Sequence, residues 1–163
     1  MGFGYKMRKI VLTLFLLILL ACSDDPFVKS GNHKHIPLNF KKGEMLCAEC
    51  KMPVDSLKYS AQVVLNNGDT YFFDDPGCVA LWLNTIENRK SAVIWMYSLD
   101  TERWIDGRKA FYSIFDKTPM NFGFGAYEKH LQGYISYEEM FVRMIRGENL
   151  TNPIIRKKLL ETL

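Results

Sequence analysis

Residues 47–83 read CAECKMPVDSLKYSAQVVLNNGDTYFFDDPGCVALWL, and this stretch decides the predicted fold of the chain. It contains three of the four cysteines. Two of them, Cys47 and Cys50, are separated by two residues, and the thioether of Met52 follows directly after them. Thiolates and thioethers are the ligands that Cu(I) prefers, and a single turn can bring these three sulfurs to one ion. The start of the stretch therefore predicts a soft-metal site.

A hairpin is expected after this sulfur-rich turn. Residues 58–65 (KYSAQVVL) and 70–73 (TYFF) are rich in β-branched and aromatic side chains, as strands are. Asn67-Gly68 between them tolerates the positive φ angles of a type I′ turn, which favours a hairpin. Residues 91–97 (SAVIWMY) form a nearly continuous apolar run, which predicts a third, central strand.

A helix is expected between the hairpin and the third strand. Asp75 can cap a helix that starts at Pro76 and ends near Glu87. Cys78 lies on the apolar face of this helix, where a cysteine usually acts as a small buried hydrophobe. A role for Cys78 as an additional ligand or redox partner stays open. The carboxylates of Asp74 and Asp75 are expected to serve as turn and cap rather than as cation ligands.

The second half of the chain weakly repeats this order. Residues 110–115 (AFYSIF) predict a strand, and a loop with two glycines follows Met120. An amphipathic helix over residues 137–144 is expected, with Ser136 as its cap.

The predicted fold class is α+β, with small mixed sheets and packed helices in two ββαβ-like halves. The domain is expected over residues 44–147, with halves at about 44–99 and 100–147. Residues 148–163 are expected to form a C-terminal tail with a short helix. The chain that follows the expected leader is long enough to form one hydrophobic core.

The N-terminus predicts a lipoprotein signal peptide over residues 1–21. Three basic residues precede an apolar run from Ile10 to Leu20, which is about half the ~20 residues that a membrane-spanning helix needs. The run ends in Leu19-Leu20-Ala21-Cys22, which resembles a bacterial lipobox. Cleavage before Cys22 would leave this thiol acylated and the chain anchored to membrane lipid. An uncleaved anchor helix is the alternative.

Removal of residues 1–21 changes the balance of charges and thiols. The whole chain has 21 basic and 18 acidic residues, and the leader carries three of the basic ones and no acid. The remaining chain is formally neutral, which removes the main support for a nucleic-acid partner. Lipidation would leave Cys47, Cys50 and Cys78, and an odd number of thiols outside the cytoplasm leaves at least one free or bound to a metal.

Residues 22–43 are expected to link the lipid to the domain. The segment is polar and contains breakers such as Pro26 and Pro37 without sustained periodicity. It also contains His33 and His35, a pair that can bind Cu(II) or zinc. A solvated linker without a metal is the alternative for this pair.

Cys47 and Cys50 fit other sites less well than a soft-metal site. A c-type haem attachment needs His after the second Cys, where this chain has Lys51. A structural zinc site commonly needs a second pair of ligands, whereas Cys78 stands alone in the sequence. A redox pair at the start of a helix conflicts with Pro53, which would cut that helix short. A structural disulfide would close a very small loop and stabilise little.

Several short motifs follow one another over about residues 45–145. They are Cys47-x-x-Cys50-x-Met52-Pro53-Val54, Tyr59-Ser60-Ala61-Gln62, Asn67-Gly68, Phe73-Asp74-Asp75-Pro76-Gly77-Cys78, Trp82-Leu83 and Thr118-Pro119-Met120-x-x-Gly123-x-Gly125-Ala126. This order resembles the NosL family of copper-binding lipoproteins. The resemblance implies Cu(I) binding outside the cytoplasm and delivery to nitrous oxide reductase, and it adds Met120 to the expected ligands Cys47, Cys50 and Met52.

Two positions depart from the pattern of that family. Lys51 and Asn121 stand where the family usually has glycine. Both residues can still serve in tight turns if their φ angles are positive, Asn more easily than Lys. The departures therefore concern the shape of the two loops more than the ligands.

The sequence as a whole favours a Cu(I) metallochaperone over an enzyme. The expected protein is anchored by lipid on the periplasmic side of a membrane, and its partner would be a cuproenzyme or a copper-transport protein. A sulfur-rich site near the surface can pass Cu(I) by ligand exchange without releasing it. The contrasting hypothesis is a membrane-tethered thiol–disulfide oxidoreductase that uses Cys47 and Cys50.

Overall fold

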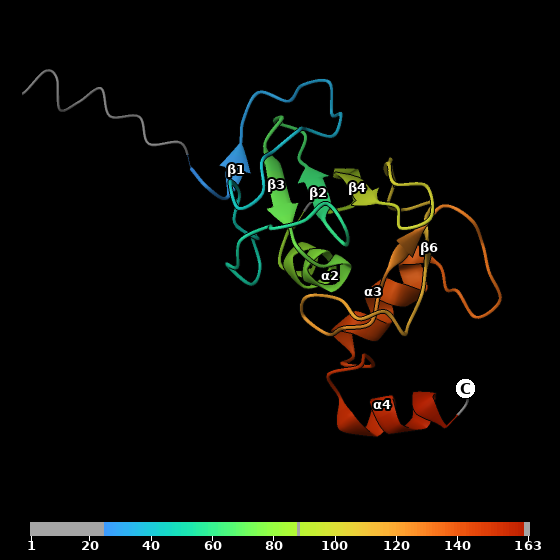
Figure 1. Cartoon of the computed structure of the whole chain (residues 1–163). Helices are drawn as coiled ribbons and strands as arrows, with labels where there is room; N and C mark the ends of the chain where they lie inside the picture. Colours follow the sequence, from blue (N-terminus) through green and yellow to red (C-terminus); the bar gives the residue numbers. More distant parts are fainter. Residues whose placement is uncertain (1–24, 88, 162–163) are drawn as a thin grey trace, which may run out of the picture.

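The computed structural model describes residues 25–161 except residue 88 (Figure 1). The predictions for the signal peptide, residues 1–21, and for the lipidation of Cys22 lie outside the described residues. Within the described range, every helix is too short or too polar to cross a membrane.

The main structural unit is a five-stranded antiparallel sheet with the order β1-β3-β2-β4-β5 (Figure 1). Its interior strand β4 is the apolar run that the sequence predicts to be central, and its side chains alternate between buried and half-buried. The strands are β1 (Val28–Lys29), β2 (Ala61–Val64), β3 (Thr70–Phe73), β4 (Val93–Tyr97) and β5 (Trp104–Asp106).

The predicted hairpin is formed by β2 and β3, but its turn differs from the expected type I′. Gly68 has a φ of +85°, whereas Asn67 does not have a positive φ. The N–H of Leu65 donates to the carbonyl of Asp69, and the N–H of Gly68 donates to that of Leu65. These bonds describe a three-residue loop in which only Gly68 needs the left-handed region.

Helix α2 (Pro76–Asn84) follows the hairpin and covers one face of the sheet. As predicted, Asp75 caps it, because its carboxylate accepts a hydrogen bond of 2.8 Å from the N–H of Gly77. Trp82 of α2 packs on the rings of Tyr71 and Phe73, at centroid distances of 4.6 and 5.4 Å. The order β2-β3-α2-β4 confirms the ββαβ arrangement of the first half.

The second half does not form a separate sheet of the same kind. Its first strand, β5, pairs with β4 and so extends the sheet of the first half. The strand expected over residues 110–115 is limited to β6 (Phe111–Tyr112), which pairs with β7 (Ala126–Tyr127). Helix α3 (Tyr137–Ile145) then packs against α2. The fold is therefore α+β with one shared core.

Much of the segment expected to be a linker packs against the sheet. Strand β1 pairs with β3, and the ring of Phe40 packs on Phe72 at a centroid distance of 5.3 Å. The buried amide of Gln62 exchanges two hydrogen bonds of 2.8 Å with the backbone of Leu38. These contacts cover the face of the sheet that α2 leaves open, so this part of the chain belongs to the domain.

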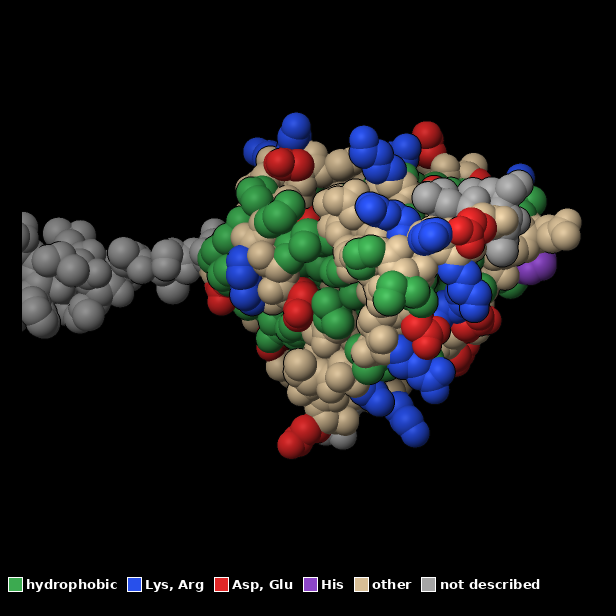
Figure 2. All heavy atoms as spheres, turned by 90° about the horizontal axis from the view of Figure 1, so that it is seen from below, with side chains coloured by type: hydrophobic (Ala, Val, Ile, Leu, Met, Phe, Trp, Pro, Cys, Tyr) green, Lys and Arg blue, Asp and Glu red, His purple; other side chains and the backbone are tan. Residues whose placement is uncertain are grey.

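The C-terminal segment begins on the core and then leaves it. Asn149 is buried, and the N–H of Leu150 donates to the carbonyl of Phe122. The predicted tail helix is α4 (Pro153–Leu160), which lies apart from the sheet (Figure 1). Its second residue, Ile154, is highly exposed. From the side of α4, hydrophobic side chains gather on one part of the surface and Lys and Arg on another (Figure 2).

Candidate metal centre

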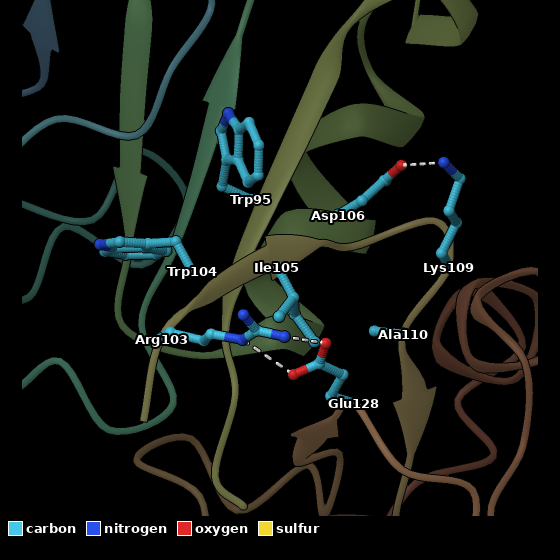
Figure 3. A pocket seen from close by; sticks show the side chains of 8 residues that line it. All are labelled: Trp95, Arg103, Trp104, Ile105, Asp106, Lys109, Ala110 and Glu128. Atoms are coloured by element: carbon cyan, nitrogen blue, oxygen red, sulfur yellow. Dashed lines mark hydrogen bonds and ion pairs between the residues drawn. The ribbon is translucent and has the colours of Figure 1, made fainter. Parts of the chain in front are cut away.

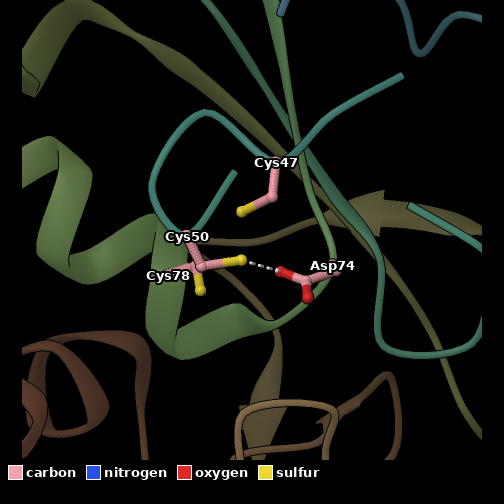
Figure 4. A group of neighbouring side chains, drawn as sticks. All are labelled: Cys47, Cys50, Asp74 and Cys78. Carbon is pink, nitrogen blue, oxygen red and sulfur yellow. Dashed lines mark hydrogen bonds between the residues drawn. The ribbon is translucent and has the colours of Figure 1, made fainter. Parts of the chain in front are cut away.

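Three thiols and one carboxylate meet in a single cluster (Figure 4). The ligand atoms of Cys47, Cys50, Asp74 and Cys78 all lie within 4.8 Å of one another. None of the three cysteines forms a disulfide. In a tetrahedral site with metal–sulfur bonds of about 2.3 Å, the sulfurs lie about 3.8 Å apart. Small side-chain movements would therefore bring the four atoms around one ion.

A tight turn positions Cys47 and Cys50 on the same side of the backbone. The N–H of Lys51 donates to the carbonyl of Cys47, and the N–H of Cys47 donates to that of Met52. Lys51 has a φ of +67°, in the left-handed region that a chain reversal of this kind requires. The N–H of Ala48 donates to the carbonyl of Phe72, which attaches the turn to β3.

The junction between β3 and α2 supplies the other two ligands. Asp74 directly follows β3, and Cys78 lies in the first turn of α2. Asp75 lies between them and caps the helix through the N–H of Gly77. Its carboxylate also accepts a hydrogen bond of 3.0 Å from the N–H of Met120. The cluster therefore combines two segments that are 24 or more residues apart in the sequence.

Burial leaves one oxygen of the cluster without a partner. Cys47, Asp74 and Cys78 are buried, whereas Cys50 is half-buried. The thiol of Cys50 donates a hydrogen bond of 3.3 Å to Oδ1 of Asp74. Oδ2 of Asp74 is buried and accepts no hydrogen bond. A buried carboxylate oxygen without a partner is costly, and a bound cation would satisfy it.

The three thiols differ in acidity because of their different surroundings. The pKa of Cys47 is lowered, first because the thiol of Cys78 donates a hydrogen bond to its sulfur, and also because backbone N–H groups of Cys50 and Asp74 do so. The same hydrogen bond and burial raise the pKa of Cys78. Burial raises the pKa of Cys50 to about 12. The deepest thiol, Cys47, is therefore the one that most readily forms a thiolate.

The two methionines expected as ligands are less buried than Cys47, Asp74 and Cys78. Met52 is 44% exposed, and its carbonyl accepts the hydrogen bond that closes the turn. Met120 is half-buried against the core, and its N–H donates to Asp75, next to the ligand Asp74. Their positions suit residues that meet a metal at the surface more than residues that enclose it. Within the described part of the chain, His33 and His35 are outside the cluster.

Sequence reasoning predicted Cys47 and Cys50 as candidate ligands but not the complete cluster. Cys78 was expected mainly as a core residue; it is indeed buried, but its sulfur faces the other two (Figure 4). Asp74 was expected as a turn residue, yet its carboxylate faces the thiols. No local signal marked Asp74, because a spacing of four residues places side chains on one face only within a helix, and α2 begins at Pro76.

The hollow drawn in Figure 3 offers less to a ligand. It has a volume of about 280 Å³ and is lined in part by Trp95 and Trp104. Its carboxylates are already paired: Glu128 forms a two-point ion pair with Arg103, and Asp106 lies 3.5 Å from Lys109. The first pair joins the residue before β5 to the residue after β7, and the second lies within the turn after β5, so both have a structural explanation.

Comparisons of this chain with protein-family models, with curated proteins and with solved structures found no match.

Proposed function

We propose that this chain is a lipid-anchored carrier that binds Cu(I) through Cys47, Cys50 and Cys78. The observation that carries the proposal is the cluster of three thiols without a disulfide beside a carboxylate oxygen that has no partner. Thiolates favour soft metal ions, and Cu(I) is one of them. The metal is the cargo of this protein, so the site must both hold it and release it.

The burial of the ligands supports transfer by ligand exchange. Cys50 is half-buried and Met52 is exposed, whereas Cys47 and Cys78 are enclosed. A sulfur ligand of a partner protein can therefore approach the metal from the side of Cys50 and Met52. Cu(I) accepts two to three sulfur ligands, so an incoming ligand can join before Cys50 leaves. The metal then passes between proteins without becoming free.

The likeness of the motifs to the NosL family supplies the recipient and the location in this proposal. The recipient is nitrous oxide reductase, a cuproenzyme of denitrification, and acylated Cys22 holds the carrier on the periplasmic side of a membrane. The backbone supports the likeness at both departures from the family pattern. Lys51 and Asn121 have φ angles of +67° and +56°, in the region where glycine is most at ease.

The thiol chemistry supports a carrier more than an oxidoreductase. A thiol–disulfide oxidoreductase attacks with an accessible thiolate of low pKa. In this chain the thiol with the lowered pKa, Cys47, is fully buried, and the more accessible Cys50 has a pKa of about 12. Neither thiol combines the accessibility and the acidity that this enzyme class needs.

Anaerobic titration of the full chain in detergent with Cu(I), against a chromophoric Cu(I) chelator, tests the proposal. The wild type is expected to bind one Cu(I), and Cys47→Ser is expected to weaken binding by about tenfold or more, because a thiolate ligand is lost. Met140→Leu, which removes a buried thioether of α3 that is not among the proposed ligands, is the control and is expected to bind as the wild type does.

A variant that lacks Cys47, Cys50 and Met120 together can contradict the proposal. If it still binds one Cu(I) as tightly as the wild type, the proposed carrier site is wrong. If instead Cys47 and Cys50 cycle with a measurable reduction potential and catalyse thiol–disulfide exchange, the oxidoreductase replaces the carrier as the function of this chain.

A further inference from the structure

The carboxylate of Asp74 is an unusual neighbour for a site that takes only Cu(I). Carboxylate oxygens suit harder or borderline ions, and Zn²⁺ accepts both thiolates and Asp oxygens in a tetrahedral arrangement. A site built for Cu(I) alone would be expected to have a thioether in this place. Of the two thioethers expected as ligands, Met52 is exposed and Met120 is only half-buried, whereas the carboxylate of Asp74 is buried within the cluster.

Charge gives a second reason to consider a divalent ion. Once a metal has displaced the thiol protons, three thiolates and one carboxylate would carry four negative charges in a mostly buried cluster. A monovalent ion would offset one of these charges and a divalent ion two, and uncompensated buried charge is strongly unfavourable. The positive charge on the same turn belongs to Lys51, and its described contacts are with other groups. Its ammonium donates to the carbonyl of Ala48 and lies over the ring of Phe27 at 4.9 Å.

The free oxygen completes the coordination number. Zn²⁺ in closed sites is almost always four-coordinate, and the three sulfurs leave one position. Oδ2 of Asp74 is buried beside them without a hydrogen bond. A zinc site seemed poorly supported in the sequence because Cys78 stands alone there; the fold brings Cys78 to the other two thiols and Asp74 with it.

We propose that the same cluster also binds a thiophilic divalent ion of the Zn²⁺ class in a tetrahedral site, with Asp74 as the fourth ligand. Cu(I) uses the sulfurs alone and leaves the carboxylate free. Binding of the divalent ion displaces the thiol protons to the solvent and changes no oxidation state. This inference rests on the proposed metal site but not on Cu(I) being its physiological cargo.

Parallel measurements with Zn²⁺ and Cu(I) on the full chain and on Asp74→Asn test this inference. Each metal is titrated anaerobically against a chromophoric chelator. Asp74→Asn is expected to weaken Zn²⁺ binding by about tenfold or more, since a charged ligand is lost, and to change Cu(I) binding by less than about threefold. Asp55→Asn, at an exposed acid outside the cluster, is the matched control and is expected to change neither.

Spectroscopy of the wild type makes the test independent of the folding of the variant. Co²⁺ in place of Zn²⁺ is expected to give the intense visible bands of a tetrahedral ion together with thiolate charge-transfer bands. A ¹¹³Cd nuclear magnetic resonance signal is expected between those of sites with two and with four sulfurs. Octahedral Co²⁺ bands, or an equal loss of Cu(I) and Zn²⁺ binding in Asp74→Asn, would overturn the inference.

The outcomes also separate this inference from the proposed function. Tight Cu(I) binding without measurable Zn²⁺ binding would remove the divalent site and leave the carrier. Tight Zn²⁺ binding with weak Cu(I) binding would remove the Cu(I) carrier and leave the tetrahedral site. Neither result depends on the identity of a partner protein.

Discussion

At the scale of single residues, the turn that carries the two neighbouring thiols depends on Lys51. This lysine has a φ of +67°, and a residue with a Cβ atom pays about 1–2 kcal/mol for this conformation. The conformation is nevertheless required, because it lets the hydrogen bonds between Cys47 and Lys51 and between Cys47 and Met52 close the turn. The chain thus stores a small strain next to two of its candidate metal ligands.

Lys51→Gly is therefore expected to stabilise the protein by about 1 kcal/mol, because glycine adopts positive φ without steric cost. Equilibrium unfolding in urea measures the difference. Lys51→Ala is the matched control, since it removes the same ammonium contacts but keeps the Cβ atom, and it should give no such gain. Equal effects of the two substitutions would show that the φ angle is not the cause.

The site residues differ in whether the neighbouring sequence could predict them. Cys47 and Cys50 could be predicted because two residues separate them and one turn joins them. Asp74 could not, since a carboxylate before a helix cap has the sequence of an ordinary turn. It becomes a candidate ligand only because the backbone bond from Ala48 to Phe72 places the turn beside the end of β3.

At the scale of elements, the start of α2 is the point where the halves of the chain meet. Asp75 accepts hydrogen bonds from Gly77 of its own helix and from Met120 of the second half. A Cβ atom on Gly77 would lie 2.9 Å from Cγ of Phe122 and 3.1 Å from Sδ of Met144. Glycine is therefore needed here for close packing, although it does not adopt a positive φ.

Gly77→Ala is expected to lower the free energy of unfolding by about 1–3 kcal/mol, the usual cost of overpacking a tight contact. Chemical denaturation of Gly77→Ala, of Phe122→Leu and of the double variant measures these free energies of unfolding. The double variant should show less loss than the sum of its two single changes, because the smaller side chain relieves the clash. Strict additivity would mean that the ring of Phe122 does not limit this position.

The elements that could be predicted are those with strong local signals. The hairpin has strands rich in β-branched and aromatic residues around Asn67-Gly68, and helices α2 and α3 have caps at Asp75 and Ser136. Strands β6 and β7 are only two residues long each, and long-range pairing alone defines them. Patterns within a short window cannot contain that information.

At the scale of the whole molecule, the predicted boundaries were less accurate than the predicted elements. Residues 28–40 complete one face of the sheet, although their polar sequence favours a linker. Strand β5 joins the sheet of the first half, although it follows the expected boundary at residue 100. The partner of β1 is β3, which is more than 25 residues away in the sequence. The partner of β5 is β4, which belongs to the other expected half. The composition of a segment does not indicate partners of either kind.

The distribution of the ligands over the fold leads to a prediction about the whole molecule. A metal bound by all four residues would tie the turn of residues 47–52 to the end of β3 and the start of α2. Free metal at about a thousand times its dissociation constant would then stabilise the folded state by about 4 kcal/mol. This stabilisation should reach every segment that supplies a ligand.

Hydrogen–deuterium exchange of the full chain, with and without Cu(I), measures where this stabilisation appears. Amide exchange is expected to slow together in residues 47–52 and in residues 74–80, because both segments hold the ion. In Cys78→Ser the slowing should be confined largely to residues 47–52. If the wild type already behaves in this way, the ion is held by Cys47 and Cys50 alone, and Cys78 is not a ligand of Cu(I).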